Sequence, residues 1–103
     1  MAERSVVYWR DIPAQVMVRI GRRAERRELP VRFIQAIDRA AMRVGARDSD
    51  TYLAQWRRGT PEPCGDDLAA EVDAALAILV DDYDSAAVEK LVLNGGYAAG
   101  DVG

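Results

Sequence analysis

The chain has 103 residues, of which half are hydrophobic and 30% are charged, a balance typical of a folded domain and not of a disordered segment. It contains no histidine and one cysteine, which excludes a His-dependent nucleophile, an internal disulfide and a zinc site built from Cys and His. The formal net charge is −3, but residues 1–58 carry 13 Arg against 7 acids, whereas residues 59–103 carry 1 Lys against 10 acids.

This division of charge has two interpretations. In the first, the two halves attract each other and their charged side chains form solvated faces. In the second, the arginine-rich half presents a basic docking face.

No apolar run approaches the roughly 18 residues of a membrane span, and the first residues mix acidic and basic side chains where a signal peptide would be apolar. The sequence therefore predicts a cytoplasmic location and no membrane partner.

Strands are predicted at the N-terminus. Residues 5–11 are rich in β-branched and aromatic side chains, and Pro13 interrupts the ladder after them. Residues 14–20 alternate between apolar and polar, as expected of a strand with one buried face. Gly21 then provides a turn. Residues 22–29 are predicted to form a polar edge strand with outward-pointing Arg23, Glu25 and Arg27.

Helices are predicted in the rest of the chain. The first begins at Pro30, carries an apolar stripe at intervals of three and four, and ends at Gly45. A short second helix begins after Asp48 or Ser49 and stops at Gly59. Residues 60–65 are then predicted to form a Pro-rich loop.

The last two helices begin at acidic caps. The third starts at Asp66 or Asp67 and forms the main packing helix, and the fourth starts at Asp84 or Ser85 and ends at residues 94–96. The sequence thus predicts an α+β fold in which a two- or three-stranded antiparallel sheet packs against three to four helices. We expect one domain over residues 1–94 and a flexible Gly-rich tail over residues 95–103.

The sequence shows no arrangement of residues for catalysis or for holding a cofactor. Gly95 and Gly96 follow a helix and lack the Lys and Ser/Thr of a phosphate-binding loop. The acidic residues at 66–73 and 81–84 fit helix caps and lack the spacing of a calcium loop. We therefore predict no catalytic residue, no metal and no cofactor.

Cys64 has two interpretations. A position before a helix N-terminus would lower the pKa of the thiol and make it reactive. The carboxylates of Asp66 and Asp67 act in the opposite direction, and we favour the second interpretation, in which Cys64 is a small, half-buried hydrophobic side chain.

The arginine-rich half contains the candidate binding surface. We predict that this surface is formed by Tyr8, Trp9, Arg10, Gln15, Arg19, Arg22, Arg23 and Arg26. Aromatic and arginine side chains are enriched at protein-binding hot spots, and arginine also suits carboxylate and phosphate groups. Glu25 and Glu28 interrupt the cluster and no RNA-binding signature appears, which argues against nucleic acid.

Several of these residues also carry a family resemblance. The run YWRDIPAQV at 8–16, followed by Glu28-Leu29-Pro30, Arg32-Phe33, Ala36-Ile37-Asp38, residues 40–43, Tyr52-Leu53 and Trp56, resembles the small bacterial family named virulence factor. This family is related to a segment of conserved virulence factor C. The resemblance covers about residues 5–93. It implies an accessory role beside folate-dependent and corrinoid-dependent methyl-transfer proteins, and it implies no catalytic residues.

Three hypotheses follow for function. The first is a non-catalytic accessory protein that docks a larger bacterial protein, conceivably a methyl-transfer enzyme, through the arginine-rich face. The second is a nucleic-acid-binding module, and the third is a redox or enzymatic role that depends on Cys64. The sequence leaves the oligomeric state and the identity of the partner open.

Overall fold

The computed structural model describes residues 1–46 and 50–98. Its elements in chain order are β1 (Ala2–Trp9), β2 (Ile12–Ile20), β3 (Arg23–Glu28), α1 (Val31–Arg43), α2 (Asp50–Ala54), β4 (Trp56–Arg58), β5 (Glu62–Cys64), α3 (Leu68–Asp82) and α4 (Ser85–Leu93). The predicted α+β class is confirmed. The antiparallel sheet has five strands in the described part of the chain, where two or three were predicted.

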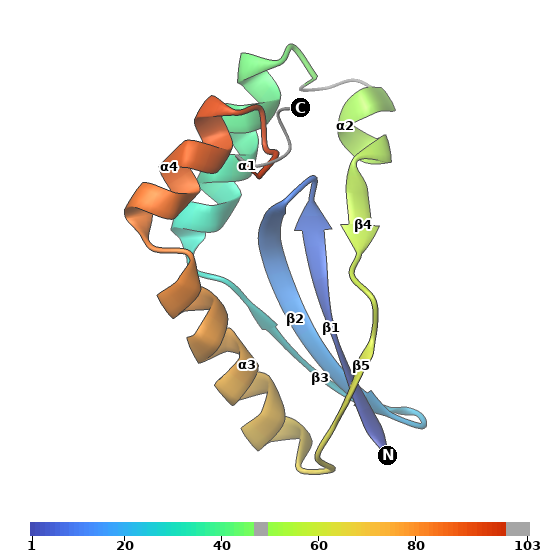
Figure 1. Ribbon diagram of the computed structural model, residues 1–103. Helices are drawn as coiled ribbons and strands as arrows, with labels where there is room; N and C mark the ends of the chain where they lie inside the picture. Colours follow the sequence, from blue (N-terminus) through green and yellow to red (C-terminus); the bar gives the residue numbers. More distant parts are fainter. Residues whose placement is uncertain (47–49, 99–103) are drawn as a thin grey trace.

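The sheet has the order β3-β2-β1-β4, and β5 also pairs with β1 (Figure 1). β4 and β5 share one edge of β1, because Trp9 faces Trp56 near one end of β1 and Ala2 faces Cys64 near the other. Between them the Gly59 N–H donates to the Val6 carbonyl over 2.7 Å, which keeps the connecting segment on the edge. β4 and β5 therefore act as a single edge strand along β1 that is interrupted between Arg58 and Glu62.

A bulge in β2 changes the twist of the β1–β2 hairpin. The register moves from Val7 opposite Gln15 to Tyr8 opposite Pro13, so Ala14 is an extra residue on β2. A bulge of this kind bends its strand and increases the right-handed twist. The hairpin tip therefore curves away from the rest of the sheet.

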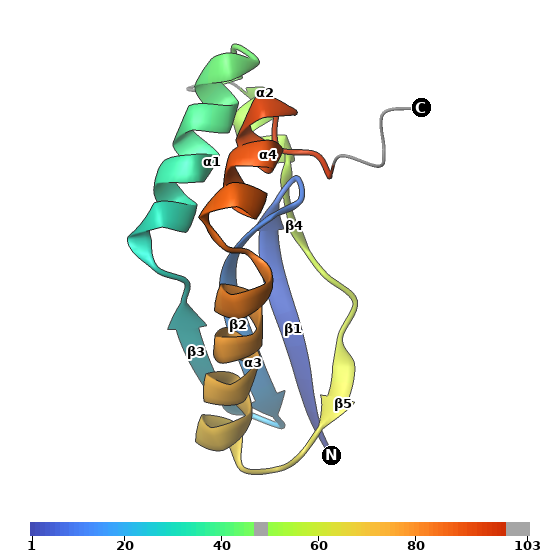
Figure 2. The same cartoon turned by 60° about the vertical axis from the view of Figure 1, so that its left-hand side comes forward.

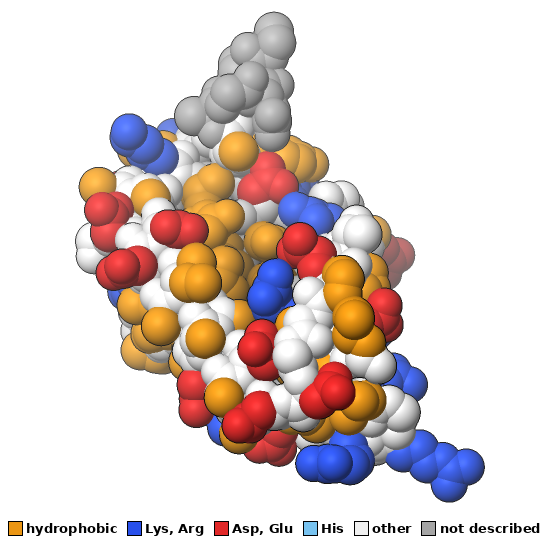
Figure 3. Space-filling model, turned by 60° about the horizontal axis from the view of Figure 1, so that its bottom comes forward, with side chains coloured by type: hydrophobic (Ala, Val, Ile, Leu, Met, Phe, Trp, Pro, Cys, Tyr) orange, Lys and Arg blue, Asp and Glu red, His pale blue; other side chains and the backbone are white. Residues whose placement is uncertain are grey.

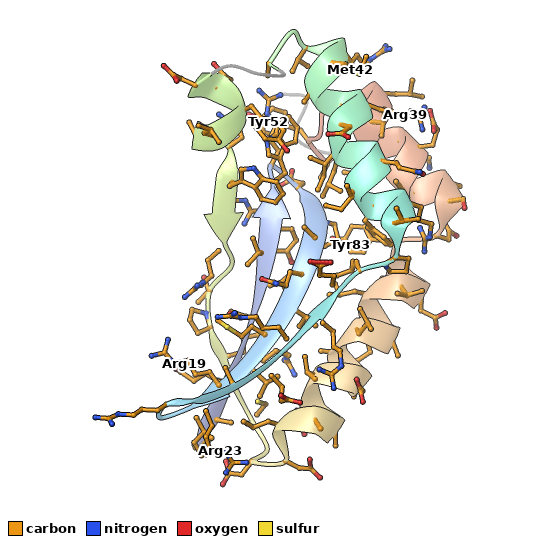
Figure 4. The ribbon with its side chains drawn as sticks, turned by 180° about the vertical axis from the view of Figure 1, so that it is seen from behind. Arg19, Arg23, Arg39, Met42, Tyr52 and Tyr83 are labelled. Atoms are coloured by element: carbon orange, nitrogen blue, oxygen red, sulfur yellow. The ribbon has the colours of Figure 1, made fainter. Side chains whose placement is uncertain are left out.

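The helices α1, α3 and α4 lie along one side of the strands (Figures 1 and 2). One core cluster joins α3 to the sheet and contains Val16 and Val72. The other joins the hairpin tip to α1 and α4 and contains Trp9, Phe33 and Val88. Burial on this side of the sheet leaves the opposite side of β1, β2 and β3 without a helix over it, as the view from behind shows (Figure 4).

The helix ends follow the expected capping chemistry. A carboxylate oxygen of Asp67 accepts a hydrogen bond from the Ala70 N–H over 3.2 Å, and one of Asp84 accepts from the Ala87 N–H over 2.8 Å. Gly45 has a φ of 68°, which confirms it as the left-handed residue after α1. The proposed caps at residues 48 and 49 lie outside the described residues.

Two predictions of local structure are wrong. The second helix ends at Ala54 and does not continue to Gly59, because residues 56–58 form β4 against β1. The segment predicted to be a loop contains β5, although it includes Pro61 and Pro63. A strand of three residues at a sheet edge tolerates Pro, since its outer N–H groups need no ladder partner.

The orientation predicted for the third strand is also wrong. Arg27 points toward α3, where its Nε donates to Asp73 over 3.0 Å, and Arg26 points to the opposite side.

Residues 95–98, which the sequence analysis assigned to the tail, contact the hairpin tip. The Gly96 carbonyl accepts a hydrogen bond from the Asp11 N–H over 2.8 Å. Among the described residues, no helix is long and apolar enough to cross a membrane.

Candidate functional site

The residues of the predicted binding surface occupy three separate places. Gln15, Arg19 and Arg26 lie on the helix-free side of the sheet. Arg22 lies in the turn that follows β2, and Arg23 begins β3 opposite Ile20, on the side of the strand that also carries Arg27. Tyr8 lies on the helix side. Trp9 and Arg10 lie at the hairpin tip, within or against the core.

Trp9 belongs to the core and contributes nothing to the molecular surface, since its relative exposure is 0%. Its indole Nε1–H donates to the Tyr52 carbonyl over 2.9 Å, and its ring lies 5.8 Å from the Tyr52 ring. A buried tryptophan with a satisfied N–H explains the aromatic residue of the YWRD run by packing alone.

Arg10 fastens the C-terminal segment to the hairpin tip. It has a φ of 55°, which is unusual for a residue with a side chain. Its guanidinium lies 5.0 Å from the Trp9 ring centroid and 4.6 Å from that of Tyr97, and its Nη1 donates to the Gly95 carbonyl over 2.8 Å. The guanidinium is therefore engaged inside the molecule through Nη1 and the two rings, while its buried Nε has no hydrogen-bond partner among the described residues.

We call the helix-free side of the strands the open sheet face. Strand pairing brings its side chains together in rows: Ser5 lies opposite Met17, Met17 opposite Arg26, Val7 opposite both Gln15 and Arg58, and Glu3 opposite Arg19. Met17 and Ser5 form the shielded centre, with relative exposures of 6% and 7%. Part of this face is a hollow of 420 Å³ lined by Glu3, Ser5, Met17, Arg19 and Arg58, among others.

Ion pairs engage some arginines of the described chain and not others; Arg10, Arg32 and Arg43, for example, donate to backbone carbonyls. Arg4, Arg27, Arg39 and Arg57 each form an ion pair with an acidic side chain. Within residues 1–46 and 50–98, no carboxylate forms such a pair with Arg19, Arg26 or Arg58, all of which are exposed. Arg19 and Arg23 are seen at the β2–β3 end of the sheet in Figure 4.

The charge of the open sheet face is positive but mixed. Glu3 and Glu28 lie at its margins, where strand pairing places them opposite Arg19 and Gln15. Arg22 extends the basic character into the turn beyond Ile20. The three arginines of the face, Arg19, Arg26 and Arg58, therefore outnumber its two acids, and the turn adds one more.

A second hollow lies on the opposite side of the sheet, between β1, β4 and the α3–α4 junction. This helix-side cleft has a volume of 740 Å³. Its lining includes Arg4, Val6, Tyr8, Asp11, Arg57, Thr60, Glu62, Asp82, Tyr83, Ala87, Lys90 and Leu91. Figure 3 shows a hollow with hydrophobic side chains inside it and charged side chains around it.

Arg57 organises one wall of the helix-side cleft. Its guanidinium lies over the Tyr8 ring, 4.4 Å from the centroid. Its Nη2 donates to Asp11 Oδ1 over 3.0 Å, and its Nε donates to the Arg10 carbonyl over 2.9 Å. The other oxygen of Asp11 accepts from the Ala98 N–H, so both members of this ion pair are held in place.

Tyr83 forms the wall opposite, at the end of α3. Its ring packs edge-on against Phe33, with centroids 6.4 Å apart. Burial raises the pKa of the Tyr83 hydroxyl, and the nearby Tyr8, Asp11 and Asp82 raise it further. The hydroxyl therefore keeps its proton at neutral pH and acts as a hydrogen-bond donor.

Cys64 lies in β5 opposite Ala2 and is half-buried against the α3 core cluster. Burial raises the pKa of its thiol, and the carboxylate of Glu71 raises it further. At neutral pH the group is the protonated thiol, which supports the interpretation of Cys64 as a small hydrophobic side chain.

Sequence reasoning missed the side chains that β4 and the α3–α4 junction contribute. Arg57 and Arg58 were placed in a helix, Asp82 was interpreted as one of the acids at a helix end, and Tyr83 and Lys90 were assigned to no site. The sequence marked β4 only by Gly59, which indicates a turn after it, because the three residues of β4 are too few to show the alternation of a strand. No group of three or more acidic or Cys side chains among the described residues is arranged to hold a metal ion.

Comparison with known proteins matches the chain to a protein family. The family model described as virulence factor matches residues 7–92, which is most of the chain and includes most residues of both surfaces described above, but not those of β1 before Val7. No curated protein and no solved structure matches the chain.

Proposed function

Because the chain belongs to the virulence factor family over residues 7–92, we propose that it works as a non-catalytic docking module for a larger protein. The open sheet face is the docking surface, and the partner presents acidic side chains to it. The observation that carries this proposal is the set of three exposed arginines, Arg19, Arg26 and Arg58, that lack a carboxylate partner within the described chain.

The chemistry of the face suits a protein surface. Arginine is the cation most enriched at interfaces because its planar guanidinium makes two hydrogen bonds to one carboxylate and loses little hydration. The centre of the face is small or apolar, with Val7 and Met17 between the arginines. A shielded apolar centre inside a charged rim is the usual anatomy of an interface.

The same face is poorly suited to single-stranded nucleic acid. Proteins that bind bases on a sheet stack them on aromatic side chains. Trp56, which shares its side of β4 with Arg58, packs edge-on against Tyr52 and against the core. Tyr8 lines the cleft on the other side and Trp9 is buried, so no row of free aromatic rings is seen on the described part of the open sheet face. Nucleic acid is therefore the second candidate.

The expected partner is a bacterial cytoplasmic protein. The family resemblance implies a protein of folate-dependent or corrinoid-dependent methyl transfer, and we propose such an enzyme as the first to be tested. In this role the module would bind and position its partner.

The test is capture of a partner by a C-terminally tagged protein from its own cells, after nuclease treatment. Charge reversal by Arg19→Glu or Arg26→Glu should abolish capture, because each places a carboxylate against an acidic partner. Lys90→Glu is the matched control, since it reverses an exposed cation on the helix side and should leave capture unchanged.

The captured protein is then purified and its affinity is measured at two salt concentrations. An affinity that falls with salt and is lost in the two arginine variants supports docking through the open sheet face. Equal binding by all variants, or capture of nothing, would overturn the proposal. A complex that disappears with nuclease would instead assign the face to nucleic acid.

A further inference from the structure

The helix-side cleft lies on the other side of the same strands from the proposed docking surface, and Ser5 of β1 borders both hollows. Its volume of 740 Å³ is within the range of sites for small organic molecules. The lining combines apolar side chains with polar groups that converge from three parts of the chain: β1, the β4–β5 segment and the α3–α4 junction. This combination is typical of a ligand site.

The charges of the cleft divide into paired and unpaired groups. Arg57 is paired with Asp11 over 3.0 Å, and Arg4 is paired with Glu62 over 3.7 Å. Two charged side chains of the lining remain: Lys90 and Asp82, neither of which forms an ion pair within the described chain. The cleft therefore offers a ligand one positive and one negative group.

The hydroxyl groups of the cleft add hydrogen-bond donors. The side-chain hydroxyls of Tyr8, Thr60 and Tyr83 donate no hydrogen bond to another group of the described residues. Burial, and after it the acidic neighbours, raise the pKa of Tyr83, so its hydroxyl is a donor at neutral pH. These donors would suit the oxygen atoms of a carboxylate.

The remaining wall is apolar. Val6 and Leu91 contribute aliphatic surface, and the Tyr8 ring is held in place by the Arg57 guanidinium on one side and by Gly59 close to its edge. A ligand that fills this space requires an apolar group in addition to its charges.

We propose that the helix-side cleft binds a small zwitterion with an apolar side group, of the class of free amino acids. Lys90 attracts the carboxylate, Asp82 attracts the ammonium group, and the apolar group lies between Tyr8, Val6 and Leu91. An ion with a single charge would leave one of the two unpaired side chains without a partner, and it should bind less tightly.

The experiment uses L-phenylalanine as the probe, with two compounds that each lack one of its charges. The first is 3-phenylpropanoate, which has no ammonium group, and the second is 2-phenylethylamine, which has no carboxylate. Binding is measured by titration of the ¹⁵N-labelled full chain, followed through the amide signals of residues 82–91. L-Phenylalanine should bind about three- to tenfold more tightly than either compound.

Variants then assign each charge. Lys90→Ala should weaken L-phenylalanine to the level of 2-phenylethylamine and leave the latter unchanged, whereas Asp82→Asn should do the same with respect to 3-phenylpropanoate. Asp81→Asn is the matched control, because Asp81 is an exposed neighbour outside the cleft lining. Circular dichroism verifies that each variant is folded.

Two results would overturn the proposal. One is the absence of saturable shifts up to about 10 mM probe, a concentration that would detect a dissociation constant of about 1 mM. The other is equal affinity for the three compounds, which would show that the two charges take no part. Neither result bears on docking, since Arg19 and Arg26 lie on the opposite side of the sheet.

Discussion

The guanidinium of Arg57 covers the ring of Tyr8 at 4.4 Å while it holds the carboxylate of Asp11 at 3.0 Å. One side chain from β4 thus fixes a residue of β1 and a residue of the β1–β2 turn. We expect Arg57→Ala to lower the free energy of unfolding by about 1 kcal/mol, because a stacked and hydrogen-bonded arginine is lost. Urea denaturation would measure this change.

Arg58→Ala is the matched control for that measurement. Arg58 is the next residue of the same strand, but it lies on the open sheet face and pairs with no carboxylate of the described chain. We expect its free energy of unfolding to stay within about 0.5 kcal/mol of the wild type. A loss as large as that of Arg57→Ala would contradict the role assigned to Arg57.

Gly59 is required because β4 passes close to Tyr8. A Cβ at residue 59 would lie 3.1 Å from Tyr8 Cε1 and 3.3 Å from the Val6 carbonyl oxygen. Since the carbonyl belongs to a paired strand and cannot move freely, Gly59→Ala should cost about 1–2 kcal/mol of stability. Thermal denaturation should show a clear fall in the melting temperature.

Gly65→Ala provides the contrast. Its Cβ would come even closer to an atom, 2.9 Å from Glu71 Oε2, but that atom ends a flexible side chain that can turn away. We therefore expect little loss of stability at residue 65. If both variants were equally destabilised, distance alone and not the rigidity of the neighbour would decide the cost.

Trp9 supports the core and is unsuitable for testing docking. Its ring is fully buried and its N–H is bonded to the Tyr52 carbonyl. Trp9→Ala should lower the free energy of unfolding by about 3–5 kcal/mol, a large part of the stability of so small a domain. Arg19→Glu should leave the urea midpoint nearly unchanged, which makes it the better probe of the surface.

The pair of Arg39 and Glu89 should make stability depend on pH. Two hydrogen bonds of 2.9 Å join the side chains, and the bond to Arg39 lowers the pKa of Glu89 in the folded state. A carboxyl with a lowered folded pKa stabilises the fold above its unfolded pKa, and this contribution disappears as the pH falls through the folded value.

We expect Glu89→Gln to be less stable than the wild type at pH 7 and to approach it below about pH 4.5, the ordinary value for a glutamate. Denaturation curves across this range would measure the difference. A difference that stayed constant with pH would show that the ion pair makes no contribution and that only the shape of the side chain matters.

Cys64 should react slowly. Because burial and Glu71 raise the pKa of its thiol, little thiolate exists at neutral pH. We expect slower alkylation by iodoacetamide at pH 7.5 than for a thiol in an unfolded peptide, with faster reaction in urea. Rapid reaction in the native state would return weight to a redox role.

The sequence predicted the strands and helices whose residues carry a local signal. The alternation of residues 14–20, the caps at Asp67 and Asp84, and the turn at Gly45 each depend on neighbours in the chain, and the structure confirms them. β4 and β5 depend instead on pairing with β1, which is distant in the sequence: the paired residues Trp9 and Trp56 are about 50 positions apart. Three residues are too few to reveal such pairing by their own pattern.

The candidate surfaces illustrate the same limit. Arg19 and Arg26 were both singled out, and strand pairing places them around Met17, but Trp9 and Arg10 were assigned to the same surface because they are close in sequence. Trp9 is instead enclosed at the hairpin tip by residues of α1 and α4, which are far from it in the sequence. The charges of Asp82 and Lys90 become relevant only when α3 and α4 meet β1.

Arg57 and Arg58 show how much depends on the register of β4. Consecutive residues of a strand point to opposite sides, so one arginine holds the Tyr8 wall and its neighbour belongs to the open sheet face. Deleting or inserting one residue between Ala54 and Gly59 would exchange these two environments without altering the composition of the chain. The family should therefore accept many substitutions on both surfaces, yet hardly any change of length in this short segment.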